Sequence, residues 1–414
     1  MRAGENAGSR LLYLGFAFPP GVQGLYPERN PAGHALETQM ISELRRHFQI
    51  RSAGVLPIIP PVVQDAQPDS GIAHEVLLLE KPPELFHRFR SLARLKAEYL
   101  RWRAAGWQPE TILVYNLSPI YNQFLLWLRR QPDCPKLVLL LLDSANLGQH
   151  LPRLKRLRRG LKPMCIPDSE MIPHFDACVG LSRDTEHYFR RRQIPFLWMP
   201  GACTPSRALR PCQRGLSNGD NGPIRFGYFG ALGAHSGIKP LISAFLSQDL
   251  PATLELCGYG KSSAELTSLA RQDARLKFLG LLTPSECIEF GHRCDVLVNP
   301  RPASHGNENN FASKLFDYAL SGRAILTSSL SGVEGVLGSE AFYFDPRQFN
   351  ESLQERLAEI VSMPRAELHR RGEAIQQRIV SEFTWEKQAG RLAEFIKAVH
   401  VKESAVELTE ALAA

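Results

Sequence analysis

The sequence predicts an α/β protein with two parallel-sheet domains, and three observations support this prediction. The chain has 414 residues, which suits two domains of about 200 residues better than one. From Ile224 onwards, short apolar runs alternate with segments of helical length, as in a parallel sheet covered on both faces. A polar, aperiodic stretch at 203–223 precedes this alternation. The predicted organisation is an N-terminal Rossmann-like domain at 1–202, a linker at 203–223, a C-terminal Rossmann-like domain at 224–383, a helix at 384–400 and a tail at 401–414.

The N-terminal part opens with a predicted strand, a long loop and a helix, which together make half of a Rossmann-like unit. The strand covers 11–18, the loop 19–31 and the helix 33–48. Three glycines lie in the strand and loop, but not at the spacing of a dinucleotide-binding fingerprint: Gly15, Gly21 and Gly24. The length of the loop favours a ligand-binding role over a simple connection.

Further strands and helices follow in the N-terminal part. The predicted strands cover 74–79, 111–115, 136–142, 174–181 and 194–199, and two predicted helices cover 85–103 and 119–130. Asp143 stands at the carboxyl end of the strand 136–142, the edge at which ligands bind in open α/β sheets. We expect this aspartate either to bind substrate or to cap the turn that follows, and the sequence favours neither role.

The most informative stretch of the C-terminal part is NPRPASHGNENNFASKLFDYALSG, at 299–322. It follows the apolar run 295–298, a predicted buried strand, and contains a predicted helix from Phe311 to Leu320 that stops at Gly322. A polar loop between the carboxyl end of a strand and the start of a helix suits a phosphate or a ribose, because the helix dipole and its free N–H groups face the ligand.

These residues resemble the nucleotide-sugar site of glycosyltransferase family 4, a family of retaining enzymes. The family has two acidic residues separated by seven others, then a small residue and a glycine. In this chain Asp317 stands at the second acid and Asn309 at the first. The likeness continues more weakly across 224–346 and into the last helix. It implies the GT-B architecture, in which two Rossmann-like domains face each other across a cleft and the helix at 384–400 crosses back to the first domain.

The resemblance also implies roles for single residues. Asp317 would accept hydrogen bonds from the ribose hydroxyls, although the helix dipole alone also favours an acid in a first turn. Asn309 would contact hydroxyls of the donor sugar, with Glu308 or Asn310 in its place if the loop is shifted by one residue. The helix start near Phe311 would offer N–H donors to the diphosphate.

Positive charge for the departing diphosphate would come from Arg301 and Lys314. The family often has an Arg after its first glycine and a Lys before a later one, whereas this chain has Ala231 and Ser236 there. The diphosphate contacts are therefore expected from Arg301, Lys314, Lys239 or the first-domain loop. Other matching positions are Gly230 and Gly233 near the phosphates, Gly258 and Gly260 near the diphosphate and ribose, and Leu281 and Leu282, where backbone atoms contact the base.

On the acceptor side, the resemblance places the loop 19–31 at the cleft, where it helps to hold donor phosphate or acceptor. The expected acceptor-side residues are Gly15, Gly21, Gly24 and Asp143, and the candidate catalytic residues are Asn309, Arg301 and Lys314. Three histidines also lie in loops expected at the cleft, where a histidine is more often solvated than catalytic: His34, His235 and His305.

The net charge of +7 comes from the N-terminal half. Residues 1–200 carry 26 Lys and Arg against 18 Asp and Glu, whereas the remainder carries 23 against 24. The basic residues gather in the predicted helix 85–103 and at 151–162. Each cluster is either a solvated face or a docking surface for anionic lipid headgroups. The basic excess is confined to one domain, which favours the docking surface. Nucleic acid is not an expected partner, because no motif that reads it is recognised.

Neither a metal nor another cofactor is expected. The eight cysteines form no CxxC pair, and no DxD-type motif stands out. The sequence has no run of about 18 uncharged apolar residues, and MRAGENAGSR at the N-terminus lacks the apolar core of a signal peptide. The expected location is the cytoplasm, with peripheral binding to the inner face of the plasma membrane as a further expectation.

Together these features predict a retaining glycosyltransferase of the hexosyltransferase type. It would move a sugar from a nucleotide-diphosphate sugar to a glycan or lipid-linked acceptor, in polysaccharide or lipopolysaccharide-type biosynthesis. The residues Ala231, Ser236 and Asn309 favour an alternative, a degenerate GT-B protein that binds nucleotide sugar or glycan without turnover. A nucleotide-sugar epimerase with the same architecture is a third alternative.

Overall fold

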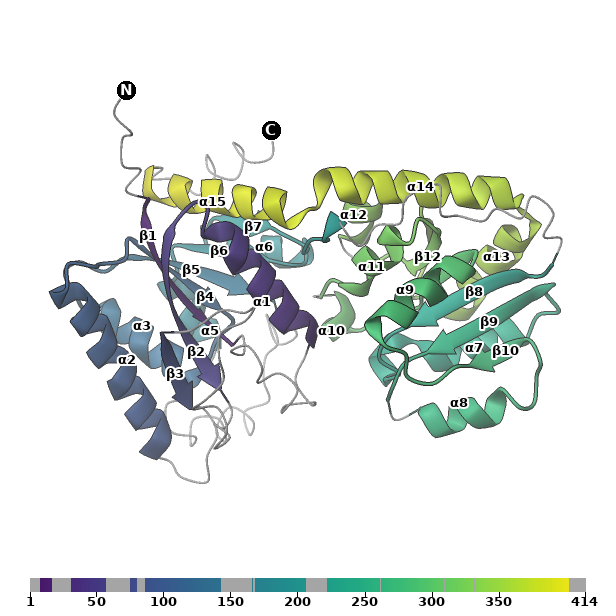
Figure 1. Cartoon of the computed structure of the whole chain (residues 1–414), viewed down its shortest axis with the longest axis horizontal. Coiled ribbons are helices and arrows are strands. Elements are labelled where there is room, and N and C mark those ends of the chain that lie inside the picture. Colours follow the sequence, from purple (N-terminus) through teal and green to yellow (C-terminus); the bar gives the residue numbers. More distant parts are fainter. Residues whose placement is uncertain are drawn as a thin grey trace. The chain divides into compact units, whose positions relative to one another are not determined.

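The computed structural model describes residues 8–16, 31–56, 75–79, 86–142, 166, 168–205, 222–260, 262–308, 310–330 and 332–401. The chain divides into two compact units, one made of Met1–Met199 with Trp385–Ala414 and the other of Pro200–Thr384. Each unit contains a parallel sheet with helices packed on it (Figure 1). The structure therefore confirms the predicted α/β class with two Rossmann-like domains.

The first unit holds a seven-stranded sheet in the order β3-β2-β1-β4-β5-β6-β7. Its strands are β1 (Arg10–Gly15), β2 (Gln49–Leu56), β3 (Val76–Leu79), β4 (Thr111–Tyr115), β5 (Lys136–Leu141), β6 (Ala177–Gly180) and β7 (Phe196–Trp198), and every neighbouring pair is parallel. Side chains alternate between the two faces along β1. Leu12 and Leu14 join one hydrophobic core, whereas Leu11 and Tyr13 join another on the opposite face.

Helices cover both faces of this sheet. They are α1 (Pro31–Leu44), α2 (Phe86–Ala104), α3 (Pro119–Leu128), α5 (Asp168–Met171), η3 (Ile172–His174), α6 (Asp184–Arg190) and α15 (Trp385–Val401). Trp102 of α2 and Phe124 of α3 are fully buried on one face, while α1 and α15 pack together on the other. The last helix therefore belongs to the first unit, although the helix before it belongs to the second.

The strand β2 was not predicted from the sequence. Its residues QIRSAGVL include three polar side chains and a glycine, so neither a continuous apolar run nor a clean alternation is visible. The strand forms because β1 and β3 pair with it on both sides. Backbone pairing within the sheet thus overrides a weak local signal.

The second unit holds a six-stranded parallel sheet in the order β10-β9-β8-β11-β12-β13. Its strands are β8 (Ile224–Phe229), β9 (Ala252–Cys257), β10 (Leu276–Phe278), β11 (Val296–Asn299), β12 (Ala324–Ser328) and β13 (Phe342–Phe344). The first strand, β8, lies in the middle, with β9 on one side and β11 on the other. The chain order therefore reverses between β8 and β11, and such a switch point opens a crevice at the carboxyl ends of the strands.

Helices again complete the unit. They are η6 (Ala234–Ser236), α7 (Ile238–Leu246), α8 (Ser263–Leu269), α9 (Pro284–Arg293), α10 (His305–Glu308), α11 (Lys314–Leu320), α12 (Val333–Leu337), α13 (Phe349–Ser362) and α14 (Arg365–Glu382). The start of α9 carries a capping box, in which Thr283 and Glu286 each bond the backbone N–H of the other. None of the helices in the described part of the chain has both the length and the apolar character of a membrane span.

The segment predicted as a linker is described only at its two ends, 203–205 and 222–223. Cys203 forms a parallel bridge with Thr384, and its backbone N–H donates to the carbonyl of Phe383 at 2.7 Å. The start of this segment thus pairs with the end of the second unit.

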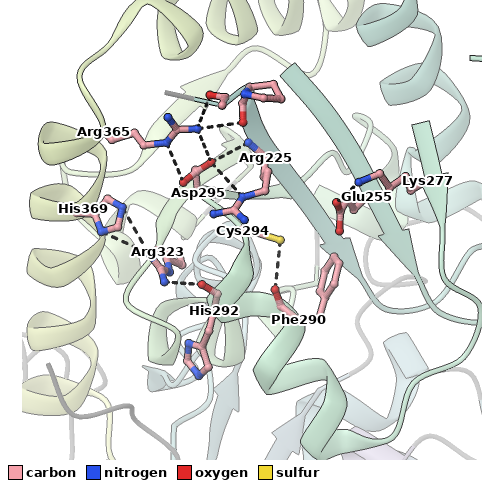
Figure 2. Close-up of polar contacts among 12 residues, drawn as sticks. Arg225, Glu255, Lys277, Phe290, His292, Cys294, Asp295, Arg323, Arg365 and His369 are labelled. Carbon is pink, nitrogen blue, oxygen red and sulfur yellow. Dashed lines mark hydrogen bonds and ion pairs between the residues drawn. The ribbon is translucent and has the colours of Figure 1, made fainter. Parts of the chain in front are cut away.

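A buried carboxylate fastens the amino ends of the strands in the second unit (Figure 2). Asp295 precedes β11 directly and is 3% exposed. It accepts a hydrogen bond from the backbone N–H of Arg225 at 2.8 Å and pairs with the guanidinium of Arg365 at 3.4 Å. Arg365 in turn donates to the carbonyls of Gly222 and Pro223, at 2.8 and 3.0 Å. This contact joins β8, β11 and α14 at the edge opposite the crevice, so it serves stability.

Candidate functional site

Three loops of the second unit meet at the carboxyl ends of β8, β9 and β11. Gly237, in the loop after β8, has a φ of +72°, and a Cβ on it would lie 1.6 Å from the carbonyl oxygen of Pro300 after β11. Gly258, directly after β9, has a φ of +144°, and its Cβ would lie 1.9 Å from the carbonyl oxygen of Gly230. Only glycine allows such close backbone contacts in this conformation. The predicted glycine positions are therefore brought together at the switch point.

The remaining predicted glycines lie in the same loops. Gly260 would meet the carbonyl of Leu232 if it carried a Cβ, and the N–H of Leu232 donates to the carbonyl of Tyr259 at 2.9 Å. Gly233 lies next to the imidazole of His235 and precedes η6. The loops after β8 and β9 thus run backbone against backbone.

The helix α11 carries Lys314 into this group of loops. The hydroxyl of Tyr318 in the same helix donates to the carbonyl of Phe229 at 2.9 Å and accepts from its N–H at 3.1 Å, which fixes α11 to the end of β8. The ammonium of Lys314 then lies 4.0 Å from the centre of the Tyr228 ring. Tyr228 is fully buried and donates its hydroxyl to the carbonyl of Ala231 at 2.6 Å.

Burial destabilises the charge of Lys314. The side chain keeps part of its exposure, yet the surrounding protein lowers the pKa of its ammonium well below the ordinary value, first by desolvation and then through the charge of Arg301. Burial also raises the pKa of the Tyr228 hydroxyl, to about 12, so the tyrosine is neutral and supplies no negative charge. The ring attracts the cation without neutralising it.

Arg301 is held beside Lys314 by an asparagine that the sequence analysis did not select. Asn307, in α10, is 2% exposed, and its amide oxygen accepts from Nε of Arg301 at 3.0 Å and from Nη2 at 2.6 Å. The carbonyl of Asn310 accepts from the third guanidinium nitrogen at 3.1 Å. Desolvation lowers the pKa of Arg301 to about 10.

The imidazole of His235 lies within electrostatic range of Arg301 and Lys314. Burial lowers the pKa of this imidazole, and the charges of Arg301 and Lys314 lower it further, so its neutral form is favoured. No carboxylate of the described residues forms an ion pair with Arg301 or Lys314. Two basic groups therefore lie together without a counter-ion in the part of the chain that the structure describes, and such a place favours an anion.

Two residues considered for the phosphate contacts, Ser236 and Lys239, offer no unpaired charge. Ser236 is buried, and its hydroxyl donates to the carbonyl of Ala231 at 2.5 Å. Lys239, which the sequence left open as a phosphate contact, forms an ion pair with Glu265 of α8 at 2.5 Å. Positive charge in this group of loops therefore comes from Arg301 and Lys314.

The helix of the site begins later than predicted, at Lys314 instead of Phe311. Phe311 is 6% exposed, and its ring centre lies 5.4 Å from that of Phe316, so the residue serves as a hydrophobic anchor before the helix. The N–H of Leu315 donates to the carbonyl of Ala312 at 2.9 Å. The N–H of Phe316 donates in the same way to the carbonyl of Ser313 at 3.1 Å, so these two first-turn amides are already bonded to the residues that precede the helix.

The structure places the other predicted donor-site residues as follows. Asp317 is exposed in the first turn of α11. Burial is the main cause that raises the pKa of Cys203 and of Cys287, and the charge of Asp317 raises both further. Leu282 follows β10, and its carbonyl accepts the thiol of Cys287 at 3.9 Å. Leu281 beside it is 71% exposed.

Several predicted residues lie outside the described part of the chain: Asn309, Gly21, Gly24, Asp143 and the basic segment 151–162. Gly15 is described at the end of β1, where its carbonyl accepts the hydroxyl of Tyr121 at 2.6 Å. A Cβ on Gly15 would lie 2.3 Å from the carboxylate of Glu37, which is 2% exposed. Close packing thus accounts for this glycine, and its acceptor-side role stays a prediction.

Within the described ranges, no three His, Cys, Asp or Glu side chains come together as ligands of a metal would. The six cysteines found there are free thiols: Cys134, Cys178, Cys203, Cys257, Cys287 and Cys294. Burial raises the pKa of each of them.

Comparisons with known proteins support the architecture. No protein-family model and no curated protein sequence matches the chain. Among solved structures, sucrose-phosphate synthase from Thermosynechococcus elongatus is similar with a TM-score of 0.64 and 15% identity, over 95% of this chain and 99% of that one. HepE of Anabaena, solved in complex with UDP, gives a TM-score of 0.62 and 15% identity over 94% and 100% of the two chains. The lipopolysaccharide outer core galactosyltransferase WaaB gives 0.60 and 12%, over 94% and 99%. These likenesses show that the chain has the GT-B fold.

Proposed function

We propose that the protein is a retaining glycosyltransferase of the hexosyltransferase type, which transfers a sugar from a nucleotide-diphosphate sugar to a glycan or lipid-linked acceptor. The observation that carries this proposal is the pair Lys314 and Arg301 at the switch point of the second sheet, which has no counter-ion among the described residues. A departing diphosphate needs fixed positive charge of this kind. The fold adds support, because similar structures include proteins named as a galactosyltransferase and as a UDP-forming trehalose-phosphate synthase.

Each residue has a separate part in the proposed reaction. Lys314 and Arg301 bind the diphosphate and stabilise the charge that develops on it as the bond to the sugar breaks. Asp317 accepts hydrogen bonds from the ribose, and Asn309 holds hydroxyls of the donor sugar. Charge stabilisation by side chains is sufficient in this scheme, so we propose that transfer needs no metal.

The donor is proposed to carry uridine. HepE has been solved with UDP and also with UDP and glucose. Its fold is shared by this chain, and the exposed Leu281 and the half-buried Leu282 after β10 offer backbone atoms and apolar surface for a base. UDP-sugars therefore come first in a donor panel, followed by GDP-, ADP- and dTDP-sugars.

Calorimetry together with a donor-hydrolysis assay tests the proposal. The purified protein is titrated with UDP, GDP and ADP, and each sugar nucleotide is then followed for release of nucleoside diphosphate. Binding together with slow hydrolysis supports a transferase, and retention of configuration is read from the anomer released. If no nucleoside diphosphate binds, the proposal is refuted.

Ser236 favours one alternative, a degenerate protein that binds nucleotide sugar or glycan without turnover. Its hydroxyl is committed to the carbonyl of Ala231, so one expected cation is missing from the phosphate loop. Binding of a nucleotide sugar without any turnover, with or without added glycan acceptors, would favour this alternative. Conversion of the sugar nucleotide to an epimer without an acceptor would instead identify an epimerase.

We also propose that the enzyme acts in the cytoplasm, at the inner face of the plasma membrane, on a precursor of polysaccharide or lipopolysaccharide type. The support lies on α2, whose outer face exposes Phe89 and Leu100 at 49% and 50%. Arg90, Arg94 and Arg101 are exposed beside them. A helix that presents apolar and basic side chains together suits the surface of an anionic bilayer.

Vesicle flotation tests the membrane proposal. The protein is mixed with vesicles of phosphatidylcholine alone or with added phosphatidylglycerol. We expect flotation only with the anionic lipid, and its loss in the double variant Phe89→Ser, Leu100→Ser. Val401→Ser is the matched control, because Val401 is an exposed apolar residue of the same unit, outside α2. Equal flotation of the double variant and the wild type would refute a role for α2.

A further inference from the structure

The side chain of Asn307, in the short helix α10, has an unusually complete set of hydrogen bonds. All of its side-chain hydrogen-bonding groups are used, although it is only 2% exposed. The amide oxygen accepts twice from Arg301, while the amide nitrogen donates to the carbonyls of His235 at 3.0 Å and Pro302 at 2.9 Å. One side chain therefore fixes the guanidinium and joins the loop after β8 to the loop after β11.

The choice of an amide at this position has an electrostatic consequence. Proteins commonly place a carboxylate where two nitrogens of one guanidinium donate side by side to the same group. A carboxylate would form an ion pair with Arg301 and cancel its charge, whereas the amide fixes the same geometry and leaves the charge in place. Carbonyl groups provide the other contacts of the guanidinium and the amide, and these groups carry no formal charge either.

The buried position makes this uncompensated charge costly for the folded protein. A cation that loses water without gaining a counter-ion is destabilised, and it recovers that free energy when an anion binds. Lys314 lies in the same situation beside Arg301. A site built in this way has low affinity for neutral ligands and high affinity for a compact anion of two or more charges.

We propose that Asn307 is a positioning residue for the donor diphosphate: it orients Arg301 toward the phosphate oxygens and keeps the guanidinium free of a counter-charge. This inference rests on the proposed function, because it concerns the same site. Asn307 lies outside the pair of positions, Asn309 and Asp317, that match the two acidic residues of the family.

The first test compares Asn307→Asp with Asn307→Ala. Inorganic pyrophosphate and UDP are titrated into each protein by calorimetry, and circular dichroism checks the fold. The aspartate keeps two acceptor oxygens but cancels the charge, so we expect its affinity for pyrophosphate to fall about tenfold or more, and further than that of the alanine variant. Aspartate also loses the two N–H donations to His235 and Pro302, so a purely structural role predicts that the loss of affinity in each variant follows its loss of thermal stability. Gln354→Glu is the matched control, since it adds one negative charge at a half-buried position of α13 in the same unit.

A double-mutant cycle keeps the inference testable if Asn307→Asp fails to fold. Asn307→Ala and Arg301→Gln are measured singly and together. If Asn307 acts through Arg301, Asn307→Ala has no further effect on pyrophosphate affinity once Arg301 is replaced. Additive losses would overturn the inference.

Different results would refute the proposed function and the role of Asn307. Wild-type protein that binds neither pyrophosphate nor UDP would refute the proposed function itself. Wild-type protein that binds both, together with an Asn307→Asp variant of unchanged affinity, would refute only the role of Asn307. Salt provides an independent readout: added NaCl should weaken pyrophosphate binding less in Asn307→Asp than in the wild type, because fewer charges attract the ligand.

Discussion

Replacement of Lys314 by methionine tests the anion site directly. Methionine keeps most of the length and an apolar, unbranched side chain near the Tyr228 ring, but it removes the charge. Because burial opposes the charge in the folded protein, the substitution should leave the thermal midpoint of the free protein unchanged or raise it. The same substitution should weaken diphosphate binding, so stability and affinity are expected to move in opposite directions.

The size of the loss follows from the environment of the ammonium. Two unit charges about 4 Å apart attract each other by about 4 kcal/mol at the effective dielectric constant of about 20 that suits partly buried groups. Desolvation of the ligand offsets part of this, and a hydrogen bond to a charged group contributes about 1.5–3 kcal/mol net. We therefore expect a loss of about 2 kcal/mol, which is about a thirtyfold weaker affinity.

The assay is calorimetric titration of UDP and of pyrophosphate, with Lys277→Met as the matched control. Lys277 lies in β10 of the same unit, and its ammonium pairs with Glu255 at 3.0 Å on the surface (Figure 2). The control should bind like the wild type. If Lys314→Met also binds pyrophosphate like the wild type while its fold is intact, the cation does not face the ligand and the site is wrongly assigned.

Four further predictions follow from the same structure. The pKa of Lys314 is lowered in the free protein, so a bound anion should promote its protonation. Pyrophosphate affinity should therefore fall as pH rises towards the ordinary lysine value of about 10.4. Titrations in buffers of different ionisation enthalpy should show proton uptake on binding. Asp317→Ala should weaken UDP binding about tenfold and leave pyrophosphate binding unchanged, because the carboxylate is assigned to the ribose; equal losses for both ligands would contradict that assignment. Asp295→Ala should cost about 3 kcal/mol of unfolding free energy in urea, since it leaves two guanidinium groups without their buried partner. Gly258→Ala should abolish pyrophosphate binding while the domain still folds, because its Cβ would displace the carbonyl of Gly230 in the phosphate loop; unchanged affinity would show that this loop is not in contact with the ligand.

The sequence predicted the fold best where burial is continuous along a strand. The strand β4 has the predicted bounds, 111–115, and β5 ends one residue before the predicted end, because both are buried on both faces and carry only apolar residues in their interior. The strand β2 has no such run, and only its two neighbours in the sheet determine it.

The candidate site was only partly predictable. The sequence analysis selected Arg301 and Lys314. It could not predict that no carboxylate of the described residues pairs with them, because that depends on which carboxylates the fold brings near. Lys239 illustrates the point: nothing local shows that α8 would present Glu265 to it.

Asn307 shows a second limit. The loop after β11 contains the sequence GNENN, and a count from Asp317 selects Asn309. The count does not point to Asn307, which the backbone brings inward as it turns into α10, so that its amide reaches Arg301. The helix start also differs from the prediction, because Phe311 is buried against Phe316 ahead of the helix.

A crystal structure of the protein with bound UDP tests the central claim most directly. The account predicts diphosphate oxygens within hydrogen-bonding distance of the Lys314 ammonium and the Arg301 guanidinium, with Asn307 still holding the guanidinium from the side. Nucleotide bound away from the carboxyl ends of β8 and β11, or a diphosphate that contacts neither cation, would contradict it.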